Sequence, residues 1–470
     1  MTSTKVRNSI QDKIYTTIVS HCIVPFISRF LSSIINGSSE QLRCDITSTG
    51  QTFKFGGHEK IGKNNNESDD ITLIIDNPVH FCWLLLLDQK IGLGEAYMYG
   101  DWRAEPGVKD FLTCLIRAKR EKAAIGRRAS SVSSASSEPI KPRSVSLTTR
   151  FLSIIGASLL SALRYTVSIY NYVHHRIRDN TILNSRQNIS EHYDLGNDMF
   201  ELFLDNSMTY SCALFDDPNK QVSEPVNFKH LEEAQYKKID ALLDTLKLTP
   251  SDHVLEIGCG WGSSAIRAVQ RFGCKWTGLT ISTEQLEMAR ERVRAAGLED
   301  RIDLKLLDYR LETGKYTAVF SIEMIEAVGA QFLPEYFQVI HDRLEEGGKA
   351  ALQAIICPDA YYENYCRSSD FIKKHIFPGG HMPSVGAIQR SLPSDESDVP
   401  LLKMNIEREM ARHYAHTLDH WHSAWLARES DITQLGYSTT FHRKWQFYFG
   451  LCSALFTYDH INVVQLTLQK

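Results

Sequence analysis

The chain has 470 residues, enough for two or three domains that each bury a core of their own. Hydrophobic residues make up 43% and charged residues 23% of the chain, and the net charge is −4, so the charge balance indicates no nucleic-acid partner. None of the ten cysteines forms a CxxC pair, which argues against a zinc site or a disulfide framework and predicts a reducing, cytoplasmic compartment.

Residues 10–118 are predicted to form a small α+β domain. A helical run, Ile14–Ile35, comes first and follows a polar N-terminus without a signal-peptide core. The strand-like segments after it are Leu42–Ile46, Thr52–Phe55 and Thr72–Asp76. Near its end the domain carries Gly92–Trp102, a cluster of glycines and aromatic residues that packing alone explains poorly.

Residues 119–150 are predicted to be a disordered linker, because a basic, serine-rich segment buries too little apolar surface to offset its chain entropy. The next apolar stretch, Phe151–Val173, is long enough to span a membrane, which takes about 20 residues. It carries Arg164 and several tyrosines and serines, so an amphipathic or buried helix is favoured over a span. We expect a protein that associates peripherally with a membrane surface.

Strands and helices alternate from Ser185 onward, within a predicted catalytic domain over residues 151–470. This alternation predicts an α/β fold with a parallel, doubly wound sheet, in which ligands bind beyond the carboxyl ends of the strands. The expected strands are His253–Ile257, Lys275–Thr280, Asp303–Leu307, Tyr316–Ser321, Lys349–Ile356 and edge segments near Thr439–Phe441 and Val463–Leu468. The expected helices include Ser263–Phe272, Thr283–Ala296 and Pro334–Leu344.

A glycine-rich turn within Val254–Gly262 joins the first of these strands to the helix that follows. Its pattern is E-x-G-x-G-x-G, and such glycines let a ligand approach the backbone closely and meet free amide groups. The pattern differs from the dinucleotide fingerprint G-x-G-x-x-G. With the continuation G-L-T-I-S-T-E-Q, which ends at Gln285, it favours S-adenosylmethionine over a pyrophosphate.

Further segments make the pattern specific: H-Y-D-L-G-N at 192–197, Y-S-C-A at 210–213, D-Y-R at 308–310, S-I-E-M-I-E-A-V-G at 321–329 and I-F-P-G-G at 376–380. Together they resemble the cyclopropane-fatty-acyl-phospholipid synthase family, which includes the mycolic acid cyclopropane synthases. Residues 185–392 match its catalytic domain, and Gly92–Trp102 resembles the end of its N-terminal lipid-associated domain. The resemblance implies a doubly wound, Rossmann-like class I methyltransferase domain with a smaller N-terminal α+β domain.

The resemblance also implies which residues hold S-adenosylmethionine. They are Tyr210 and Ser211, which close over it; Glu256, Gly258 and Gly260 in the glycine turn; Thr280 and Gln285 at the ribose; and Tyr309 and Ile322 at the adenine.

A bicarbonate ion beside the reacting carbons is a further implication of the resemblance. The implied catalytic residues around it are Cys212, Glu326, Gln353, Ile355 and Tyr414. Gln353 stands where the family has a histidine, and a glutamine donates a hydrogen bond but does not relay a proton. Glu323, three residues before Glu326, is left open between a functional role and one at the first turn of a helix.

The chemistry that the resemblance implies starts with methyl transfer to a cis double bond, which leaves a carbocation in the acyl chain. Ring closure then needs a base that removes a proton from the new methyl group. A small bound anion supplies the charge without a tethered nucleophile, and a dry pocket protects the cation from water. We therefore expect methyl(ene) transfer from S-adenosylmethionine to unsaturated phospholipid acyl chains, which forms a cyclopropane ring.

Several alternatives remain open. The chain is alternatively a methyl-branching fatty-acid methyltransferase, a coclaurine-type small-molecule N-methyltransferase that shares Ser-Ile-Glu-Met, or a non-catalytic lipid-binding protein. A homodimer is one option for its assembly. No metal site is expected, since His192, His413 and His416 lack the spacing of metal ligands.

Overall fold

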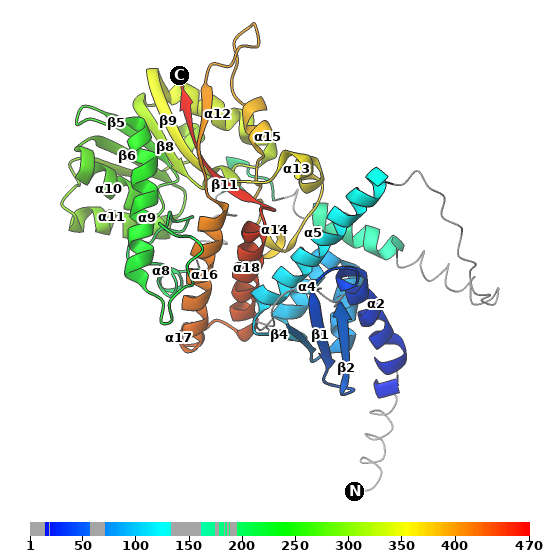
Figure 1. Ribbon diagram of the computed structural model, residues 1–470. Coiled ribbons are helices and arrows are strands. Elements are labelled where there is room, and N and C mark those ends of the chain that lie inside the picture. Colours follow the sequence, from blue (N-terminus) through cyan, green and yellow to red (C-terminus); the bar gives the residue numbers. More distant parts are fainter. Residues whose placement is uncertain are drawn as a thin grey trace. The chain divides into compact units, whose positions relative to one another are not determined.

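A computed structural model describes residues 15–17, 19–56, 71–132, 161–173, 178–182, 184–185, 188 and 195–470. The chain divides into two compact units, coloured along the sequence in Figure 1. The first comprises residues 1–171 and 438–454, and the second comprises residues 172–437 and 455–470. A segment near the C-terminus therefore belongs to the first unit.

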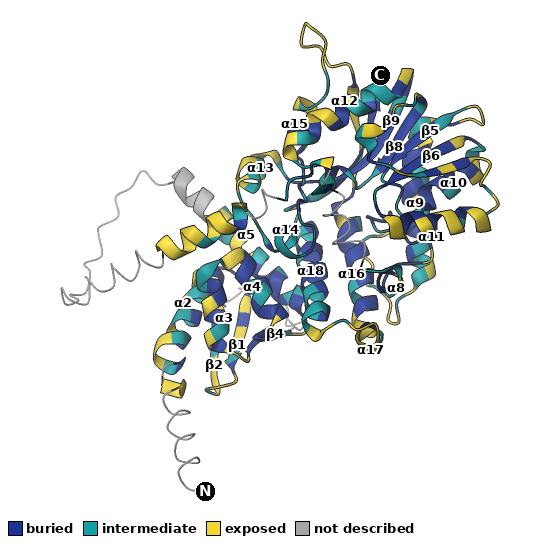
Figure 2. Cartoon of the chain, turned by 180° about the vertical axis from the view of Figure 1, so that it is seen from behind, coloured by how far each residue is buried: buried dark blue, intermediate teal, exposed yellow. Residues whose placement is uncertain are grey.

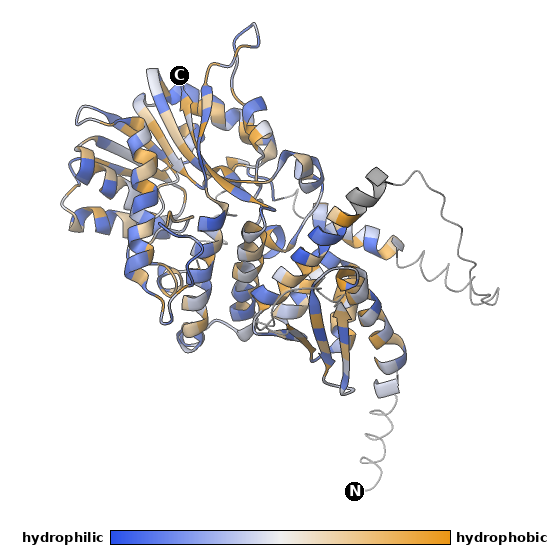
Figure 3. Cartoon of the chain, in the orientation of Figure 1, coloured by the Kyte–Doolittle hydropathy of each residue, from blue (hydrophilic) through white to orange (hydrophobic). Residues whose placement is uncertain are grey.

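The first unit combines a four-stranded sheet with helices. Its elements are the π-helix Val19–Ile23, α2 (Val24–Ile35), β1 (Gln41–Ile46), β2 (Gln51–Gly56), β3 (Thr72–Ile75), α3 (Pro78–Leu87), α4 (Gln89–Met98), β4 (Trp102–Glu105), α5 (Val108–Val132) and most of α18 (Thr439–Thr457). The strand order is β2-β1-β3-β4. Hydrophobic and hydrophilic residues alternate along β1 (Figure 3), and alternate residues of that strand are buried, as expected for a sheet with one face on a core.

Two segments of the first unit differ from the sequence-based expectation. Helix α5 continues through residues 119–132, because alanine, lysine, arginine and glutamate there are strong helix formers; the remainder of the expected linker, 133–150, lies outside the described residues. The edge strand expected near Thr439–Phe441 is wrong, since these residues open α18. The β-favouring residues Thr439–Phe441 suggested a strand, but the spacing of Phe441, Trp445 and Phe449 is that of a helix.

Packing within the first unit explains the glycine and aromatic cluster Gly92–Trp102. A Cβ atom at Gly92 would lie 2.2 Å from the Leu84 carbonyl oxygen, so α3 and α4 approach too closely for any larger residue. The Arg443 guanidinium of α18 donates to the carbonyl groups of Tyr97 and Trp102 and lies 4.1 Å from the centroid of the Tyr97 ring. These contacts give the cluster a structural role.

One helix among the described residues, Tyr15–Ile35, is long and apolar enough to cross a membrane by length and composition. Of its most apolar window, 35% is buried, and a core helix or a signal sequence passes the same test. The segment that the sequence suggested as an amphipathic or buried helix, Phe151–Val173, is helical over 161–173. Residues 151–160 lie outside the described ones.

The second unit is built on a seven-stranded sheet. Its strands are β5 (His253–Ile257), β6 (Lys275–Thr280), β7 (Ile302–Leu306), β8 (Tyr316–Ile322), β9 (Leu344–Ile356), β10 (Lys403–Glu409) and β11 (Asn462–Gln469). Its α-helices are α8 (Asn197–Glu201), α9 (Phe228–Leu243), α10 (Ser263–Phe272), α11 (Thr283–Ala295), α12 (Leu333–Arg343), α13 (Asp359–Cys366), α14 (Phe371–His375), α15 (Val385–Arg390), α16 (Ala411–Ala427) and α17 (Glu429–Gln434). The strands and helices expected here are confirmed within a few residues, apart from Thr439–Phe441.

The strand order is β10-β11-β9-β8-β5-β6-β7. Strands β5 to β9 are parallel, and β10 and β11 form antiparallel pairs at one edge. The chain winds outward from β5 to β7 and then returns to β8 on the other side of β5. The winding direction therefore changes between β5 and β8, and ligands of doubly wound sheets bind beside the strand ends at such a point. The predicted Rossmann-like α/β fold is confirmed.

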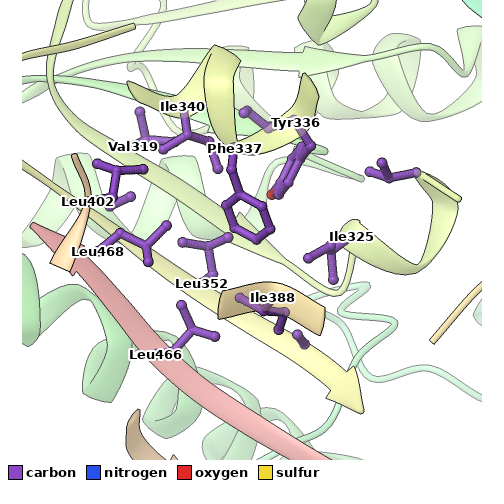
Figure 4. Packing of buried hydrophobic residues seen from close by; sticks show 14 of the residues in the cluster. Val319, Ile325, Tyr336, Phe337, Ile340, Leu352, Ile388, Leu402, Leu466 and Leu468 are labelled. Carbon is purple, nitrogen blue, oxygen red and sulfur yellow. The ribbon is translucent and has the colours of Figure 1, made fainter. Parts of the chain in front are cut away.

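Two hydrophobic cores cover the two faces of this sheet, because neighbouring strand residues point to opposite faces. Leu255, Val319 and Leu352 belong to the core that includes Tyr336 and Phe337 of α12 (Figure 4). The other core takes alternate residues of the same strands and packs them against α9, α10 and α11. The strands are buried and the outer side of α11 is exposed (Figure 2).

Candidate functional site

The glycine turn lies at the carboxyl end of β5. Gly258, Gly260 and Gly262 have φ angles of +84°, +51° and +85°, which residues with a side chain rarely adopt. The N–H groups of Gly258 and Cys259 donate to the Leu279 carbonyl at 3.0 and 2.9 Å. These bonds fix the turn against β6, and helix α10 starts directly after it.

A cavity of about 170 Å³ opens beside this turn, at the strand ends where the winding direction changes. All residues that the sequence implied for the cofactor line it: Tyr210, Ser211, Glu256, Gly258, Gly260, Thr280, Gln285, Tyr309 and Ile322. Lys238, Trp261, Arg310, Glu323 and Met324 also line it. The ends of four strands, β5 to β8, and the segment before α9 thus converge on one site.

Two buried ionisable side chains border the cavity beside the turn. Burial raises the pKa of Glu256 to about 7, although its carboxylate accepts a hydrogen bond from Trp276 Nε1 at 2.8 Å. Burial lowers the pKa of Lys238 to about 8, and its Nζ donates to Ser211 Oγ at 2.5 Å. Lys238 thereby orients a residue of the cofactor wall.

The two residues implied for the ribose are held by the ends of β6 and α11. Thr280 Oγ1 donates to Gln285 Oε1 at 3.0 Å, and the Ser282 hydroxyl caps α11 by accepting from the Gln285 N–H at 3.3 Å. The Thr280 and Gln285 side chains are buried, so hydrogen bonds within the protein hold them in place.

Beyond β7, the segment Asp308–Arg310 forms another wall. Asp308 and Arg310 are paired at 2.7 Å, and both side chains are less than a tenth exposed. Arg310 also donates to the Asn180 carbonyl at 3.0 Å. The pair fixes Tyr309, whose hydroxyl has a raised pKa because of burial and therefore stays neutral.

Next to the cofactor cavity, the residues implied for catalysis meet at a carboxylate. Glu323 Oε1 accepts from the Cys212 N–H at 2.9 Å and from Gln353 Nε2 at 2.7 Å, while Tyr414 donates its hydroxyl proton to Glu323 Oε2 at 2.8 Å. The Cys212 thiol is buried beside Glu323, which raises its pKa well above its usual value. It is therefore a neutral thiol and not a nucleophile.

Glu326 lies near enough to Glu323 to be affected by its charge, and it accepts a hydrogen bond from the Ile355 N–H. Its second oxygen, Oε2, is buried and has no hydrogen-bond partner among the described residues. Burial and the nearby Glu323 charge raise the pKa of Glu326 to about 8. The structure thus brings all of the implied catalytic residues together, although their roles stay a prediction.

Two residues of the site were missed or left open by the sequence reasoning. Lys238 has helical spacing with Leu231 and Ala234 on the buried face of α9. A lysine among such apolar positions is unusual and could have indicated a functional residue from the sequence. Glu323 directly follows β8 and has a φ of +48°, so it does not belong to a first helical turn. Of the motif H-Y-D-L-G-N, residues 192–194 lie outside the described ones.

No group of three His, Cys, Asp or Glu side chains suited to a metal ion occurs in the part of the chain that the structure describes.

Comparison with known proteins identifies the family. The profile of the mycolic acid cyclopropane synthetase family matches residues 181–466. Tuberculostearic acid methyltransferase UfaA1 of Mycobacterium tuberculosis is 40% identical over 60% of this chain and 65% of its own length. Cyclopropane-fatty-acyl-phospholipid synthase of Escherichia coli is 32% identical over 60% of this chain and 67% of its own length.

A solved relative agrees with this match. The mycolic acid cyclopropane synthase CmaA1, complexed with SAH and CTAB, superposes with a TM-score of 0.53 at 29% identity over 61% of this chain and 98% of its own. The family profile covers more than half of the chain, and the cavity lies where this fold binds its ligands. The chain belongs to the mycolic acid cyclopropane synthetase family of S-adenosylmethionine-dependent methyltransferases.

Proposed function

We propose that this protein transfers the methyl group of S-adenosylmethionine to the cis double bond of an unsaturated phospholipid acyl chain and closes a cyclopropane ring. The observation that carries the proposal is the convergence of all implied cofactor residues on one cavity whose wall includes the Glu323 carboxylate. When bound, S-adenosylmethionine supplies a methyl group on a positively charged sulfur. The protein must then position an alkene beside that methyl group, exclude water and remove a proton.

The surroundings of the cavity suit a reaction that water would spoil. Tyr210 on the cavity wall packs against Phe200, Phe203 and Trp421 with ring centroids 5.1–5.9 Å apart. Aromatic rings present apolar surface and a negative face to a cation, so they tolerate a carbocation without adding to it. The aromatic side chains behind Tyr210 therefore support a reaction that passes through a cation.

Exposed apolar side chains of the first unit support a peripheral contact with membranes. Val79 and Trp83 of α3 are 39% and 50% exposed, and Tyr165 and Ile169 of the helical segment 161–173 are 70% and 43% exposed. A contact with lipid would cover such exposed apolar side chains. Vesicles are accordingly the substrate form in which we expect turnover.

The bicarbonate ion implied by the resemblance does not fit the residues present. Its expected donors are the Cys212, Gln353 and Tyr414 groups, and all three donate to Glu323. The Ile355 N–H donates to Glu326. These groups are therefore already paired with the protein's own carboxylates.

A methyl-branched product is the second candidate, because the relative named a tuberculostearic acid methyltransferase is 40% identical over the matched region. Both products begin with the same carbocation. They differ in how the cation loses its proton and in whether a reductase acts afterwards.

The test incubates the full-length protein with methyl-labelled S-adenosylmethionine and vesicles of a cis-unsaturated phospholipid, followed by mass spectrometry of the released fatty acids. A product heavier by one labelled CH₂ group that resists ozone is a cyclopropane, whereas a product cleaved at the new carbon by ozone is a methylene-branched chain. Labelled amines with unlabelled lipid would point to an N-methyltransferase, and cofactor binding without any product would point to a lipid-binding protein.

A further inference from the structure

A single carboxylate occupies the centre of the catalytic cluster. Glu323 accepts hydrogen bonds at both oxygens: from Cys212 N–H and Gln353 at Oε1, and from Tyr414 at Oε2. These are donors that the family resemblance assigns to an exogenous anion. A carboxylate and bicarbonate present the same pair of oxygens at similar spacing, so one can replace the other in such a set of donors.

The local backbone conformation holds the Glu323 carboxylate at the edge of the cofactor cavity. Glu323 follows β8 at the winding reversal, with φ of +48° and its N–H bonded to the Gln353 carbonyl at 2.8 Å. A left-handed conformation in a residue with a side chain costs about 1–2 kcal/mol, so the surrounding contacts must maintain it. Glu323 lines the cavity, whereas Glu326 is not among its lining residues.

The neighbouring charges assign the negative charge to Glu323. Burial raises the pKa of Glu323, whereas Lys238 and three hydrogen-bond donors act in the opposite direction. Glu326 accepts from the Ile355 N–H, its Oε2 has no partner among the described residues, and it lies near the Glu323 charge. Two buried carboxylates this close do not both ionise readily, so the negative charge is better stabilised on Glu323 than on Glu326.

We propose that the Glu323 carboxylate is the built-in anion of this active site, in place of bicarbonate, and takes the proton released during ring closure. This inference rests on the proposed function. In the transfer step the methyl–sulfur bond breaks, a carbon–carbon bond forms and the positive charge moves to the neighbouring acyl carbon. A C–H bond of the transferred methyl group then breaks, its electron pair closes the ring, and its proton goes to a Glu323 oxygen. The proton leaves to solvent before the next turnover.

A tethered carboxylate carries the hazard of being alkylated by the cation. Here the donors bind both oxygens and hold the carboxylate rigidly, which lowers its nucleophilicity and fixes its direction. Gln353 makes three hydrogen bonds here: its Nε2 donates to Glu323 at 2.7 Å and to the Cys212 carbonyl at 3.4 Å, and its Oε1 accepts from Gln465 at 3.0 Å. A neutral histidine has only one donor and one acceptor nitrogen, so it could not make all three. The histidine-to-glutamine departure and Glu323 thus belong to one design.

The experiment compares the wild-type protein with Glu323→Gly and Glu323→Gln in buffers purged of carbon dioxide, with and without added bicarbonate. Glycine adopts the positive φ without strain and leaves the three donors facing an empty space. Glutamine fills the space but carries no charge and cannot take a proton. Glu287→Gln, the same change on an exposed helical position, is the control. Binding of S-adenosylhomocysteine by calorimetry shows that each variant keeps its fold.

Lipid turnover and thermal unfolding are the two measurements. We expect wild-type turnover to be independent of bicarbonate, and both Glu323 variants to lose about 10²–10⁴-fold, the contribution typical of a general base. Bicarbonate should restore turnover in part to Glu323→Gly only. In thermal unfolding, bicarbonate should stabilise Glu323→Gly and leave the wild type unchanged.

The outcomes separate the inference from the proposed function. Wild-type turnover that falls without bicarbonate, bicarbonate stabilising the wild type, or full activity in Glu323→Gly without added anion would each overturn the role of Glu323 and leave lipid methylation intact. Bicarbonate stabilising Glu323→Gly alone, in a protein that methylates no lipid, would uphold the built-in anion and reject the proposed substrate.

Discussion

Gly260 offers a direct test of the cofactor cavity. It has a φ of +51°, lines the cavity, and a Cβ atom built there would meet nothing within 4 Å. Gly297, after α11, is a matched control because it has a φ of +67° and equally open space but is not among the residues lining the cavity. In the absence of ligand, Gly260→Ala and Gly297→Ala should therefore lose similar stability, about 1–2 kcal/mol for a left-handed residue with a side chain.

Cofactor should separate the two variants. At a free concentration of about 100 times Kd, a ligand stabilises the folded protein by about 2.7 kcal/mol, and Gly297→Ala should keep this gain. The methyl group added at Gly260 enters the cofactor volume, and overpacking of this kind costs about 1–3 kcal/mol, which raises Kd about ten- to hundredfold. At the same concentration Gly260→Ala should then gain only about 0.4–1.4 kcal/mol.

The assay is denaturant unfolding of wild type and both variants with and without S-adenosylhomocysteine, with Kd values from calorimetry. Equal stabilisation of Gly260→Ala and Gly297→Ala by the ligand would refute the assignment of this cavity to the cofactor. A much larger loss of stability in Gly260→Ala without ligand would refute the premise that its added methyl group meets open space.

Three other predictions follow from buried groups. Because the pKa of Glu326 is raised from 4.5 to about 8, the folded chain retains a proton that the unfolded chain releases, so the stabilisation is full below pH 4.5 and is lost as the pH rises through 8. Glu326→Gln should flatten this decline, which amounts to at most about 1.4 kcal/mol per pH unit, in unfolding curves between pH 5 and 8. Lys238→Met should weaken S-adenosylhomocysteine binding by about tenfold or more in calorimetry, since a hydrogen bond from a charged group to Ser211 is worth about 1.5–3 kcal/mol; unchanged affinity would exclude that role. Arg443→Met should destabilise the protein by about 2–4 kcal/mol, because it removes the hydrogen bonds from a charged guanidinium to the carbonyl groups of Tyr97 and Trp102, and hydrogen exchange should rise around α4 but not around β5.

The cofactor site could be read from the sequence because its residues occupy positions that the fold itself dictates. Gly258 and Gly260 follow a buried strand, and Thr280 and Tyr309 stand just at or beyond the ends of the next two strands. Parallel strands bring their carboxyl ends to one edge of the sheet, so order along the chain translates into proximity. The same reasoning identified the strands of the second unit.

The catalytic cluster was harder to predict because its geometry depends on side-chain contacts between distant elements. Sequence spacing alone does not show whether Glu323 or Glu326 is the central carboxylate. Only the hydrogen bonds from Gln353 and Tyr414 identify Glu323. Lys238 was missed for a related reason, because its role depends on its burial in the folded protein and it belongs to no sequence motif. The fate of residues 438–454, which join the first unit, depends on long-range packing that no local pattern records.

The buried acids of the site make sense once the path of positive charge is followed. Burial raises the pKa values of Glu256 and Glu326 to about 7 and 8, so the empty site carries fewer negative charges than its three glutamates suggest, and the charge is best stabilised at Glu323. A site of this kind pays little desolvation cost while empty and gains an ion pair only when a cation is present. In the proposed reaction the positive charge resides first on sulfur, then on the acyl carbon, and finally on the proton that Glu323 accepts. Neutralising Glu323 in this way removes its attraction for a cation, which favours release of the neutral product.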